Sequence, residues 1–433
     1  MENNKKQGGV VAIVTMFFIF GMISFVTNMA APFGNIWGIT YDWAGMAGNL
    51  MNFTAYLFMG IPAGNMLIKY GYKKTALIAL IVGAIGLGVQ LLSGVVGEDI
   101  SVGVWFGQET GLNLLIYLLG ALICGFCVCM LNTVVNPMLN LLGGGGNTGN
   151  QLVQAGGTIN SLTGTLTPML AGMLVGTLTK DSFPQVAPLI VTGIVIFLAA
   201  FAIISFIKIE EPQANLSSVT YEKSPLAFRH CLLGVVAIFF YVGIEIGLPG
   251  EMNAWISRLP FEGAAAVAGS LASIYWLLML VGRAASTAIS GKVSSRAQMI
   301  TVSSVAIIFL LCAIFTGDVN INLNLNLGFI NIENANVPLS CVFIFLCGLC
   351  TSVMWGGIFN LSTEGLGKYT AKASGLFMTM VVGGGIMPFF QDYIARACED
   401  YLLSYWLIVA MLAYILFYAL VGCKNVNKDI KVD

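Results

Sequence analysis

Two ionisable residues lie most clearly inside long apolar stretches of this sequence, where a charge is costly to place. Glu245 lies within Leu232–Asn253, which reads LLGVVAIFFYVGIEIGLPGEMN, and Arg283 lies within Ile274–Ser290. A charged side chain at membrane depth is rare and usually serves binding, coupling or pairing. Glu245 is therefore the first candidate for the functional site, although a structural hydrogen bond to a neighbouring helix would also account for it.

Amide side chains form a second polar set inside the apolar stretches. Each amide offers hydrogen-bond donors and acceptors, so amides around a water-filled cavity suit the hydroxyl groups of a neutral sugar. They can equally hold two helices together by hydrogen bonds. Their concentration on a few stretches favours the cavity. The candidates for substrate binding are Asn28, Asn132, Asn136, Gln154, Asn160 and Asn360.

Aromatic side chains accompany the amides. Trp276 follows Tyr275 at the start of an apolar stretch, and Trp355 lies in the middle of another. An indole face can stack on a pyranose ring, although aromatic residues also lie at membrane interfaces and in protein cores. We therefore add Trp276 to the expected sugar-binding residues, together with Glu245, whose carboxylate can accept hydrogen bonds from hydroxyl groups.

The sequence shows no arrangement of residues typical of an enzyme active site or a cofactor site. No Ser–His arrangement, pair of acids or metal-ligand set appears, so the sequence predicts neither an enzyme nor a bound cofactor or metal. The ten cysteines lie mostly in apolar stretches, where small polarisable side chains fill helix contacts. A formal net charge of −1 provides no basic surface for nucleic acid.

The composition indicates which elements must hold these residues. Hydrophobic residues make up 58% of the 433 residues and charged residues only 9%, which is too little charge for a soluble protein of this size. A window of about 19 residues predicts an all-α integral membrane protein with twelve transmembrane helices. The expected spans lie near 10–34, 44–67, 75–94, 112–140, 151–176, 186–207, 232–253, 264–289, 298–316, 337–361, 371–395 and 402–422.

Lysine and arginine residues between the spans predict the orientation. With the N-terminus inside, the cytoplasmic loops hold most of these residues, whereas the outer loops hold only Lys180, Arg258 and Arg396. Both termini are therefore expected in the cytoplasm, as is the polar segment 208–230. The outer segment Asp318–Asn336 alternates Asn with apolar residues, which is the pattern of a short hairpin.

The two halves of the sequence repeat each other. Gly60 corresponds to Gly282 and Pro168 to Pro388, at an offset of about 220 residues. A near-constant offset indicates duplication of a six-span unit, as in many secondary transporters. The expected parts are an N-terminal six-helix bundle 1–207, a cytoplasmic linker 208–230 and a C-terminal six-helix bundle 231–433.

Longer motifs run along nearly the whole chain. In the first half they are Pro62-Ala63-Gly64 through Gly71-Tyr72-Lys73, Asn136-Pro137 with Leu142-Gly143, and Thr158-Ile159-Asn160-Ser161. In the second half they are Tyr241-Val242-Gly243-Ile244-Glu245, Tyr275-Trp276 with Gly282-Arg283, Glu364 through Thr370, and Gly383 through Pro388. By these motifs the chain resembles the fucose–proton symporter family, in the sugar branch of the major facilitator superfamily.

The resemblance implies how such a protein works. It implies a fold of two six-helix bundles, twelve helices in all, that imports a monosaccharide by alternating access. It also identifies Pro62–Lys74 and Gly282–Arg296 with the cytoplasmic gating segments of the superfamily. The expected gating residues are Lys69, Lys73 and Arg283.

The chain departs from the family at the acids that carry protons. Family symporters have an acid near the end of the first helix and another before the Asn-Pro motif, and these positions fall on Asn28 and Asn132 here. An amide does not take up and release a proton at physiological pH. The proton relay of the family therefore does not carry over, although Asn132 retains the ability to bind hydroxyl groups.

These observations predict a secondary-active importer of a monosaccharide (a hexose, deoxyhexose or N-acetylhexosamine) that works as a monomer in an inner-membrane lipid bilayer. Glu245 is the acid placed to couple uptake to a cation, with proton and sodium both open as the coupling ion. The alternatives are an uncoupled sugar uniporter, an exporter of another small metabolite and a membrane sensor on the same fold.

Overall fold

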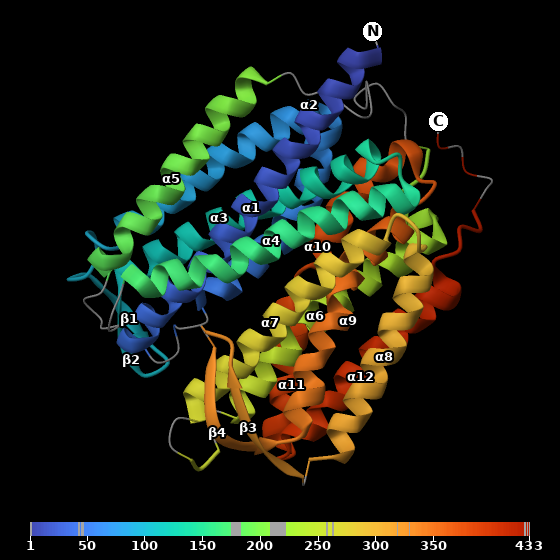
Figure 1. Cartoon of the computed structure of the whole chain (residues 1–433). Coiled ribbons are helices and arrows are strands. Elements are labelled where there is room, and N and C mark those ends of the chain that lie inside the picture. The colour runs from blue at the N-terminus through green and yellow to red at the C-terminus, as the bar shows by residue number, and fades with distance from the viewer. Residues whose placement is uncertain are drawn as a thin grey trace. The chain divides into compact units, whose positions relative to one another are not determined.

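The computed structural model describes residues 2–41, 44, 47–174, 183–207, 222–256, 259–261, 264–317, 319–328, 330–427, 430 and 432. Lys180, Arg258 and most of the expected linker 208–230 lie outside them. The described residues form helices α1 to α12 and two short β-hairpins (Figure 1). Ten of the described helices are long and apolar enough to cross a membrane, which confirms the all-α, multi-pass membrane architecture.

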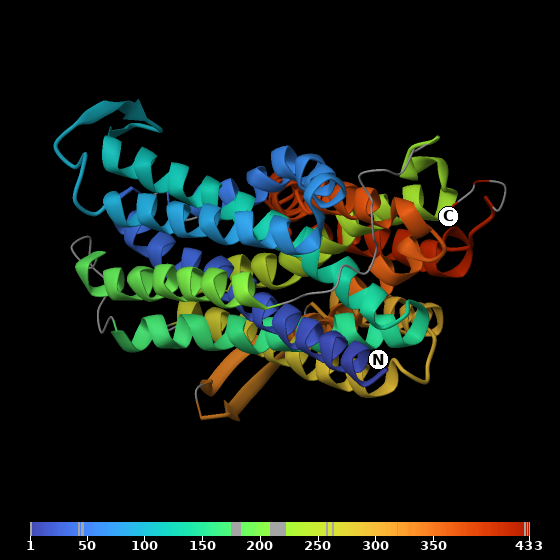
Figure 2. The ribbon, with the colours of Figure 1, turned by 90° about the horizontal axis from the view of Figure 1, so that it is seen from above.

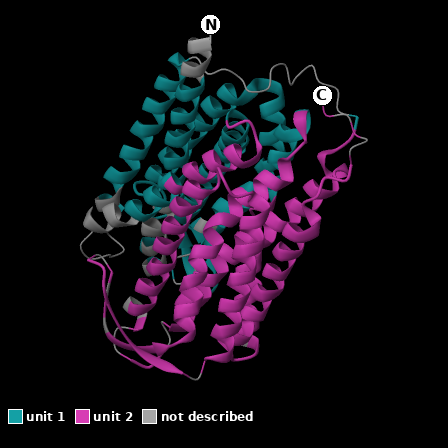
Figure 3. Ribbon diagram, turned by 45° about the vertical axis from the view of Figure 1, so that its right-hand side comes forward, with its two compact units in different colours: residues 1–142, 159–222, 368–379 teal, residues 143–158, 223–367, 380–433 magenta. Residues whose placement is uncertain are grey.

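The chain divides into two compact units (Figure 3). Unit 1 comprises residues 1–142, 159–222 and 368–379, and unit 2 comprises residues 143–158, 223–367 and 380–433. Each unit therefore contains one short segment from the opposite half of the sequence. The two exchanged segments, 143–158 and 368–379, are separated by about the same 220 residues that relate the repeated halves.

Unit 1 is built mainly from long apolar helices. Helix α2 packs along α3 and α5, and α1 packs on α3. The helices are α1 (Glu2–Thr40), α2 (Ala47–Leu92), α3 (Leu112–Leu142), α5 (Phe183–Phe206), nearly all of α10 (Thr370–Met380) and the second part of α4 (Gly146–Leu174). A small hairpin connects α2 to α3 and consists of β1 (Ser101–Trp105) and β2 (Gln108–Gly111).

Helix α2 is 46 residues long and includes most of two expected spans, 44–67 and 75–94. The sequence predicts a loop at Lys69–Lys74, but the chain instead kinks at Gly71, whose φ is 79° and ψ is 175°. A residue with a side chain rarely adopts this φ, whereas glycine does so freely. The loop prediction is wrong at this point, because the two helices are joined by a kink at one glycine.

Pro137 lies inside α3 and has no backbone N–H, so the carbonyl oxygen of Thr133 loses its usual helical partner. The Ser374 hydroxyl of α10 donates a hydrogen bond to that oxygen at 3.1 Å. An unsatisfied backbone carbonyl is costly in a membrane. Ser374 therefore ties the exchanged segment 368–379 to α3 at the point where proline interrupts the helical bonding.

Glycines let α10 approach α2 closely. A Cβ atom at Gly375 would lie 2.6 Å from the carbonyl oxygen of Gly60 and 2.9 Å from the Cα of Gly64. Small residues of this kind permit backbone-to-backbone packing between membrane helices. Close packing therefore holds the exchanged segment in addition to the Ser374 hydrogen bond.

Unit 2 is arranged around α6, which packs against α7, α9, α11 and α12. Its long helices are α6 (Arg229–Ile256), α7 (Ala264–Ile289), α8 (Ser295–Phe315), α9 (Ser340–Thr363), α11 (Gly383–Ala397), α12 (Tyr401–Phe417) and the first part of α4. Short turns of helix complete it: η2 (Pro225–Ala227), η3 (Gly367–Tyr369) and the π-helical η4 (Tyr418–Gly422).

An antiparallel hairpin connects α8 to α9 and consists of β3 (Asn320–Asn326) and β4 (Asn331–Pro338). Ile321 pairs with Val337, and Asn322 pairs with Asn336. Figure 2 shows this hairpin projecting from the helices of unit 2. Along β3 the asparagines are exposed and the apolar residues are half-buried, so the alternating pattern is confirmed as a hairpin.

The close approach of α2 and α10 gives the first prediction. Gly375→Ala places a methyl group against the α2 backbone, and such overpacking should cost about 1–3 kcal/mol of stability. The measurement is the thermal unfolding midpoint of the purified protein in detergent. Gly88→Ala is the matched control, because a Cβ atom at Gly88 meets nothing within 4 Å. Equal midpoints for the two variants would contradict the packing argument.

Candidate functional site

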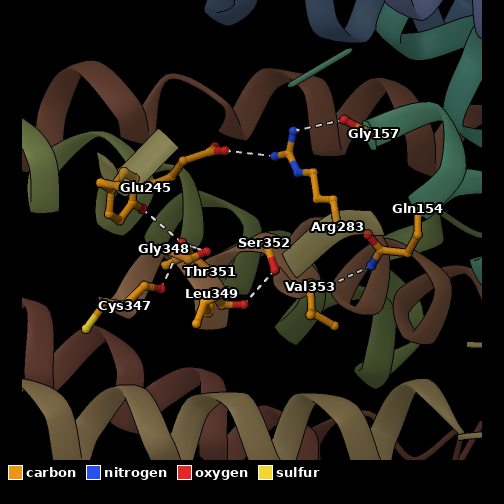
Figure 4. A network of polar contacts seen from close by, with 11 residues as sticks. Gln154, Gly157, Glu245, Arg283, Cys347, Gly348, Leu349, Thr351, Ser352 and Val353 are labelled. Carbon is orange, nitrogen blue, oxygen red and sulfur yellow. Dashed lines mark hydrogen bonds and ion pairs between the residues drawn. The ribbon is translucent and has the colours of Figure 1, made fainter. Parts of the chain in front are cut away.

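The two charged residues that the sequence places in separate apolar stretches form an ion pair (Figure 4). Nη2 of Arg283, on α7, lies 3.0 Å from Oε1 of Glu245, on α6. The Arg283 side chain is 11% exposed and the Glu245 side chain 15% exposed. Nη1 of Arg283 also donates to the carbonyl oxygen of Gly157, on α4, at 3.3 Å. Arg283 thus connects α7 to both α6 and α4.

Pairing explains how these charges are tolerated at membrane depth. A lone carboxylate or guanidinium among apolar helices carries a large desolvation cost, whereas a hydrogen-bonded pair carries no net charge. The partnership was not predicted, because the resemblance assigned Arg283 to a gating segment, whereas Glu245 was expected to couple uptake from its place as an acid in an apolar span. Lying 38 residues apart on different helices, the two give no sequence signal of contact beyond their opposite charges.

Aromatic side chains border the ion pair. Tyr241 precedes Glu245 by one helical turn, is fully buried, and its hydroxyl lies beside both charged groups. The ring of Trp355, on α9, lies 6.1 Å from the Tyr241 ring at an interplanar angle of 55°. These residues form an amphipathic wall, with aromatic faces next to hydrogen-bonding groups.

Tyr275 and Trp276 follow each other on α7 and meet edge to face, with ring centroids 5.3 Å apart. Tyr275 is fully buried, and its hydroxyl shares a 2.9 Å hydrogen bond with Thr351 of α9. Trp276 is 38% exposed. The more exposed of the two rings is therefore Trp276, the one expected to bind sugar.

Gln154 is the predicted amide that lies near the ion pair. It is 2% exposed on α4, one turn before Gly157, and Nε2 donates to the carbonyl oxygen of Val353 at 2.8 Å (Figure 4). The neighbouring amides make similar contacts, with Asn150 Nδ2 donating to Ser290 and Gln151 Nε2 to the carbonyl oxygen of Thr287. The exchanged segment 143–158 is thus held to α7 and α9 by amide hydrogen bonds.

The predicted amides of unit 1 lie around α3 and α4. Asn132 Nδ2 donates to the Tyr56 hydroxyl at 2.9 Å, and Asn136 Nδ2 donates to the backbone oxygen of Asn132. Asn160 Nδ2 donates to the carbonyl oxygen of Phe20 at 3.2 Å. The side chain of Asn28 lies outside the described residues.

Asn360 lies apart from the ion pair. It is seven residues beyond Val353 on α9, or about 10 Å along the helix. Its Nδ2 donates to the Ser295 hydroxyl at 2.8 Å. It also borders a cavity of about 470 Å³ that includes Arg296 and Lys424. The structure thus groups Asn360 with the N-terminus of α8 rather than with Glu245.

The three predicted gating residues have separate surroundings. Lys69 is exposed, with its Nζ 5.1 Å from the centre of the Tyr70 ring. Lys73 Nζ donates to the carbonyl oxygens of Ser205 and Ile207 at the end of α5, where a cation satisfies carbonyls that the helix leaves free. Arg283 contacts Glu245 instead of a loop.

One buried acid was missed by the sequence reasoning. Glu251 lies six residues beyond Glu245 on α6 and is only 5% exposed. Its signal was its place inside the predicted span 232–253, two residues before the end of that span. Helix α6 continues through Pro249 to Ile256, because a membrane helix can tolerate proline.

Within the described residues no cluster of three or more His, Cys, Asp or Glu side chains has the arrangement of a metal site. The cysteines are free thiols, and most of them are buried between helices. The polar chemistry of the described site is thus that of an ion pair, amides and aromatic rings.

Comparison with known proteins places this geometry in context. The sequence profile of the Major Facilitator Superfamily matches residues 11–388. The glucose/galactose transporter of Brucella abortus is 25% identical over 98% of this chain and 96% of its own length. The L-fucose-proton symporter of Escherichia coli is 20% identical over 90% of this chain and 87% of its own.

A solved structure has the same fold. The crystal structure of the Escherichia coli fucose:proton symporter superposes with a TM-score of 0.79 at 17% identity, covering 95% of this chain and 98% of its own. At this level of identity the likeness concerns the arrangement of helices. It confirms the fold predicted from the apolar spans and their repeat.

The ion pair gives the second prediction. Glu245→Gln and Arg283→Gln each leave one buried charge unpaired, which should cost about 3–5 kcal/mol of stability. The double variant removes both charges. Its loss of stability should therefore be clearly smaller than the sum of the stability losses of the two single variants. The measurement is unfolding of each purified protein in detergent, with Lys69→Gln as a control for removing an exposed charge. Additive losses would mean that the pair does not interact.

Proposed function

The chain belongs to the Major Facilitator Superfamily, and we propose that it carries a monosaccharide across a bacterial inner membrane by alternating access. As a member of a transporter family it is not an enzyme. The sugar class rests on the similarity to glucose/galactose and fucose transporters over most of the chain. The observation that carries the proposal is the buried Glu245–Arg283 pair beside the aromatic wall of Tyr241 and Trp355.

This arrangement suits a neutral polyol. Arg283 offers N–H donors, Glu245 offers acceptors, and the pair remains neutral overall when a hydroxyl group inserts between them. The aromatic rings can cover the apolar face of a pyranose. Asn132, Asn136, Gln154, Asn160 and Trp276 are proposed as further sugar-binding residues. Hexoses, deoxyhexoses and N-acetylhexosamines all fit this chemistry.

We propose twelve crossings with both termini in the cytoplasm. Helix α2, with its kink at Gly71, is long enough for two crossings, and α4 supplies one that is less apolar than the rest. Added to the remaining long helices, these make the twelve expected from the sequence. On this topology, 1–207 and 231–433 are the moving halves of a monomer, joined by the linker 208–230.

Alternating access gives the exchanged segment 143–158 a role. Asn150, Gln151 and Gln154 come from the first half of the chain and bond to α7 and α9 of the second. Hydrogen bonds from amides can be exchanged for bonds to water, so these contacts can break when the halves separate. We propose that they close the cytoplasmic side in one state of the cycle and hydrate in the other.

Coupling to a proton is proposed to run through Glu245. Protonation would remove its charge, release Arg283 and change the hydrogen bonds available to the sugar. A sodium ion is less suited to this residue, because Arg283 already occupies one carboxylate oxygen. The uncoupled uniporter and the metabolite exporter remain the alternatives. A proton is the ion named for the fucose symporter to which the chain is similar.

Transport by purified protein tests the proposal directly. Proteoliposomes are supplied with a panel of radiolabelled sugars under an imposed proton gradient, an imposed sodium gradient or neither. We expect saturable uptake of at least one hexose or deoxyhexose, with accumulation under the inward proton gradient. Uptake that only equilibrates identifies a uniporter. No uptake or exchange of any sugar in the panel contradicts the sugar assignment.

The third prediction separates binding from coupling. Glu245→Gln keeps the shape and acceptor oxygen of the side chain but cannot change its charge. Sugar counterflow should therefore persist, whereas accumulation under a proton gradient should be lost. Both are measured in the same vesicles, and Glu245→Asp, which keeps an ionisable group, should retain part of the accumulation. Wild-type accumulation by Glu245→Gln would overturn the coupling role.

The fourth prediction concerns the amides of unit 1. Asn132→Ala and Asn160→Ala should each weaken sugar binding by roughly 5- to 150-fold, since a lost hydrogen bond in a buried site costs about 1–3 kcal/mol. The measurement is equilibrium binding of the transported sugar to purified protein. Asn65→Ala is the control, because Asn65 is exposed. Unchanged binding with reduced stability would show that these amides only join helices.

A further inference from the structure

We propose that unit 2 holds a cation site separate from Glu245, in which Glu251, Gln391 and Tyr405 bind a monovalent metal ion such as Na⁺. We call these three residues the outer-acid site. The inference goes beyond sugar transport, because it assigns an ion-binding role to residues that take no part in the proposed sugar contacts. It rests on the positions of these side chains where α6, α11 and α12 meet.

Glu251 supplies the anionic group of the site. It is 5% exposed and lies between fully buried neighbours, Leu248 and Met252, on α6. A carboxylate is an anionic oxygen ligand that suits a hard cation. Glu251 lies within the membrane-spanning part of α6.

Gln391 supplies the neutral oxygen. It is fully buried on α11, and neither Oε1 nor Nε2 has a hydrogen-bond partner in the described structure. Its amide packs directly on Gly247 of α6, where a Cβ atom would also lie 3.3 Å from Ile408 of α12. Gly247 and Glu251 are one helical turn apart on the same face. A buried amide with both ends unsatisfied is well placed to bind a polar ligand.

Tyr405 supplies the third oxygen, from α12. Its side chain is fully buried and within electrostatic range of Glu251. The hydroxyl hydrogen is donated to the carbonyl oxygen of Leu248 at 3.2 Å. The hydroxyl oxygen can still act as an acceptor, because a phenol has both functions.

The three groups together favour a metal cation. A carboxylate, an amide oxygen and a phenol oxygen are hard oxygen ligands, and the phenol proton is already committed elsewhere. One carboxylate balances the charge of a monovalent ion. A proton on Glu251 is the competing ligand, but a proton would engage a single acceptor, whereas a metal ion can use all three oxygens.

The outer-acid site is separable from the sugar site. Six residues along α6 amount to about 9 Å and about 240° of rotation, so Glu245 and Glu251 face different neighbours. Glu245 meets Arg283 of α7, whereas Glu251 lies near Tyr405 of α12. Ion binding can therefore be measured without sugar and without transport.

The experiment measures ion binding to the purified full-length protein in detergent. Radiolabelled Na⁺ binding and the thermal unfolding midpoint are recorded at constant ionic strength, with choline replaced stepwise by Na⁺, Li⁺ or K⁺. We expect saturable binding of one Na⁺ per chain with a matching rise in the midpoint. Glu251→Gln should abolish both, and Gln391→Leu should weaken binding at least tenfold. Asp392→Asn, which removes a half-exposed acid next to Gln391, should bind like the wild type.

Three outcomes would overturn the proposal. The first is a wild-type protein that binds none of the three ions, a result that does not depend on how any variant folds. The second is folded Gln391→Leu protein with wild-type Na⁺ affinity. The third is a midpoint that responds to pH but to no metal ion, which would assign a proton to Glu251. Sugar uptake is scored separately, so failure here leaves the transport proposal standing, and the reverse also holds.

Discussion

The exclusion of unpaired charge from the membrane interior governs much of unit 2. Arg283 and Glu245 are tolerated between α6 and α7 because each neutralises the other at 3.0 Å. The guanidinium also reaches Gly157, so the same charge that needs a partner fixes α4 against α7. An ion pair that compensates two desolvation costs therefore also determines which helices meet.

Much of the fold could be predicted from the sequence, because apolar length and repeat are local or additive signals. The spans, the duplication and the 320–338 hairpin all follow from patterns of residue type. The site was predicted as single residues only. The contact between Glu245 and Arg283 depends on the packing of two helices, and the kink at Gly71 depends on one backbone angle. A hydropathy profile reports neither the packing of two helices nor the backbone angle of one residue.

The two exchanged segments are held by different physical means. Segment 143–158 is joined to α7 and α9 by amide hydrogen bonds, which water can replace. Segment 368–379 is joined to α2 and α3 by glycine packing and by one serine bond to a carbonyl that Pro137 frees. Two segments about 220 residues apart in the chain are thus held by unequal chemistry, one by bonds that water can replace and the other by close packing.

The place of segment 368–379 in unit 1 has a consequence for biosynthesis. Until a ribosome has translated residue 379, the glycine face of α2 and the Thr133 carbonyl have no covering helix from the second half. Unit 1 therefore cannot complete its packing when its other helices have been synthesised, because α10 is made much later. In the nascent chain, this face of α2 stays uncovered in the lipid until residue 379 has been made. Chaperones or proteases can act on the first half during that period.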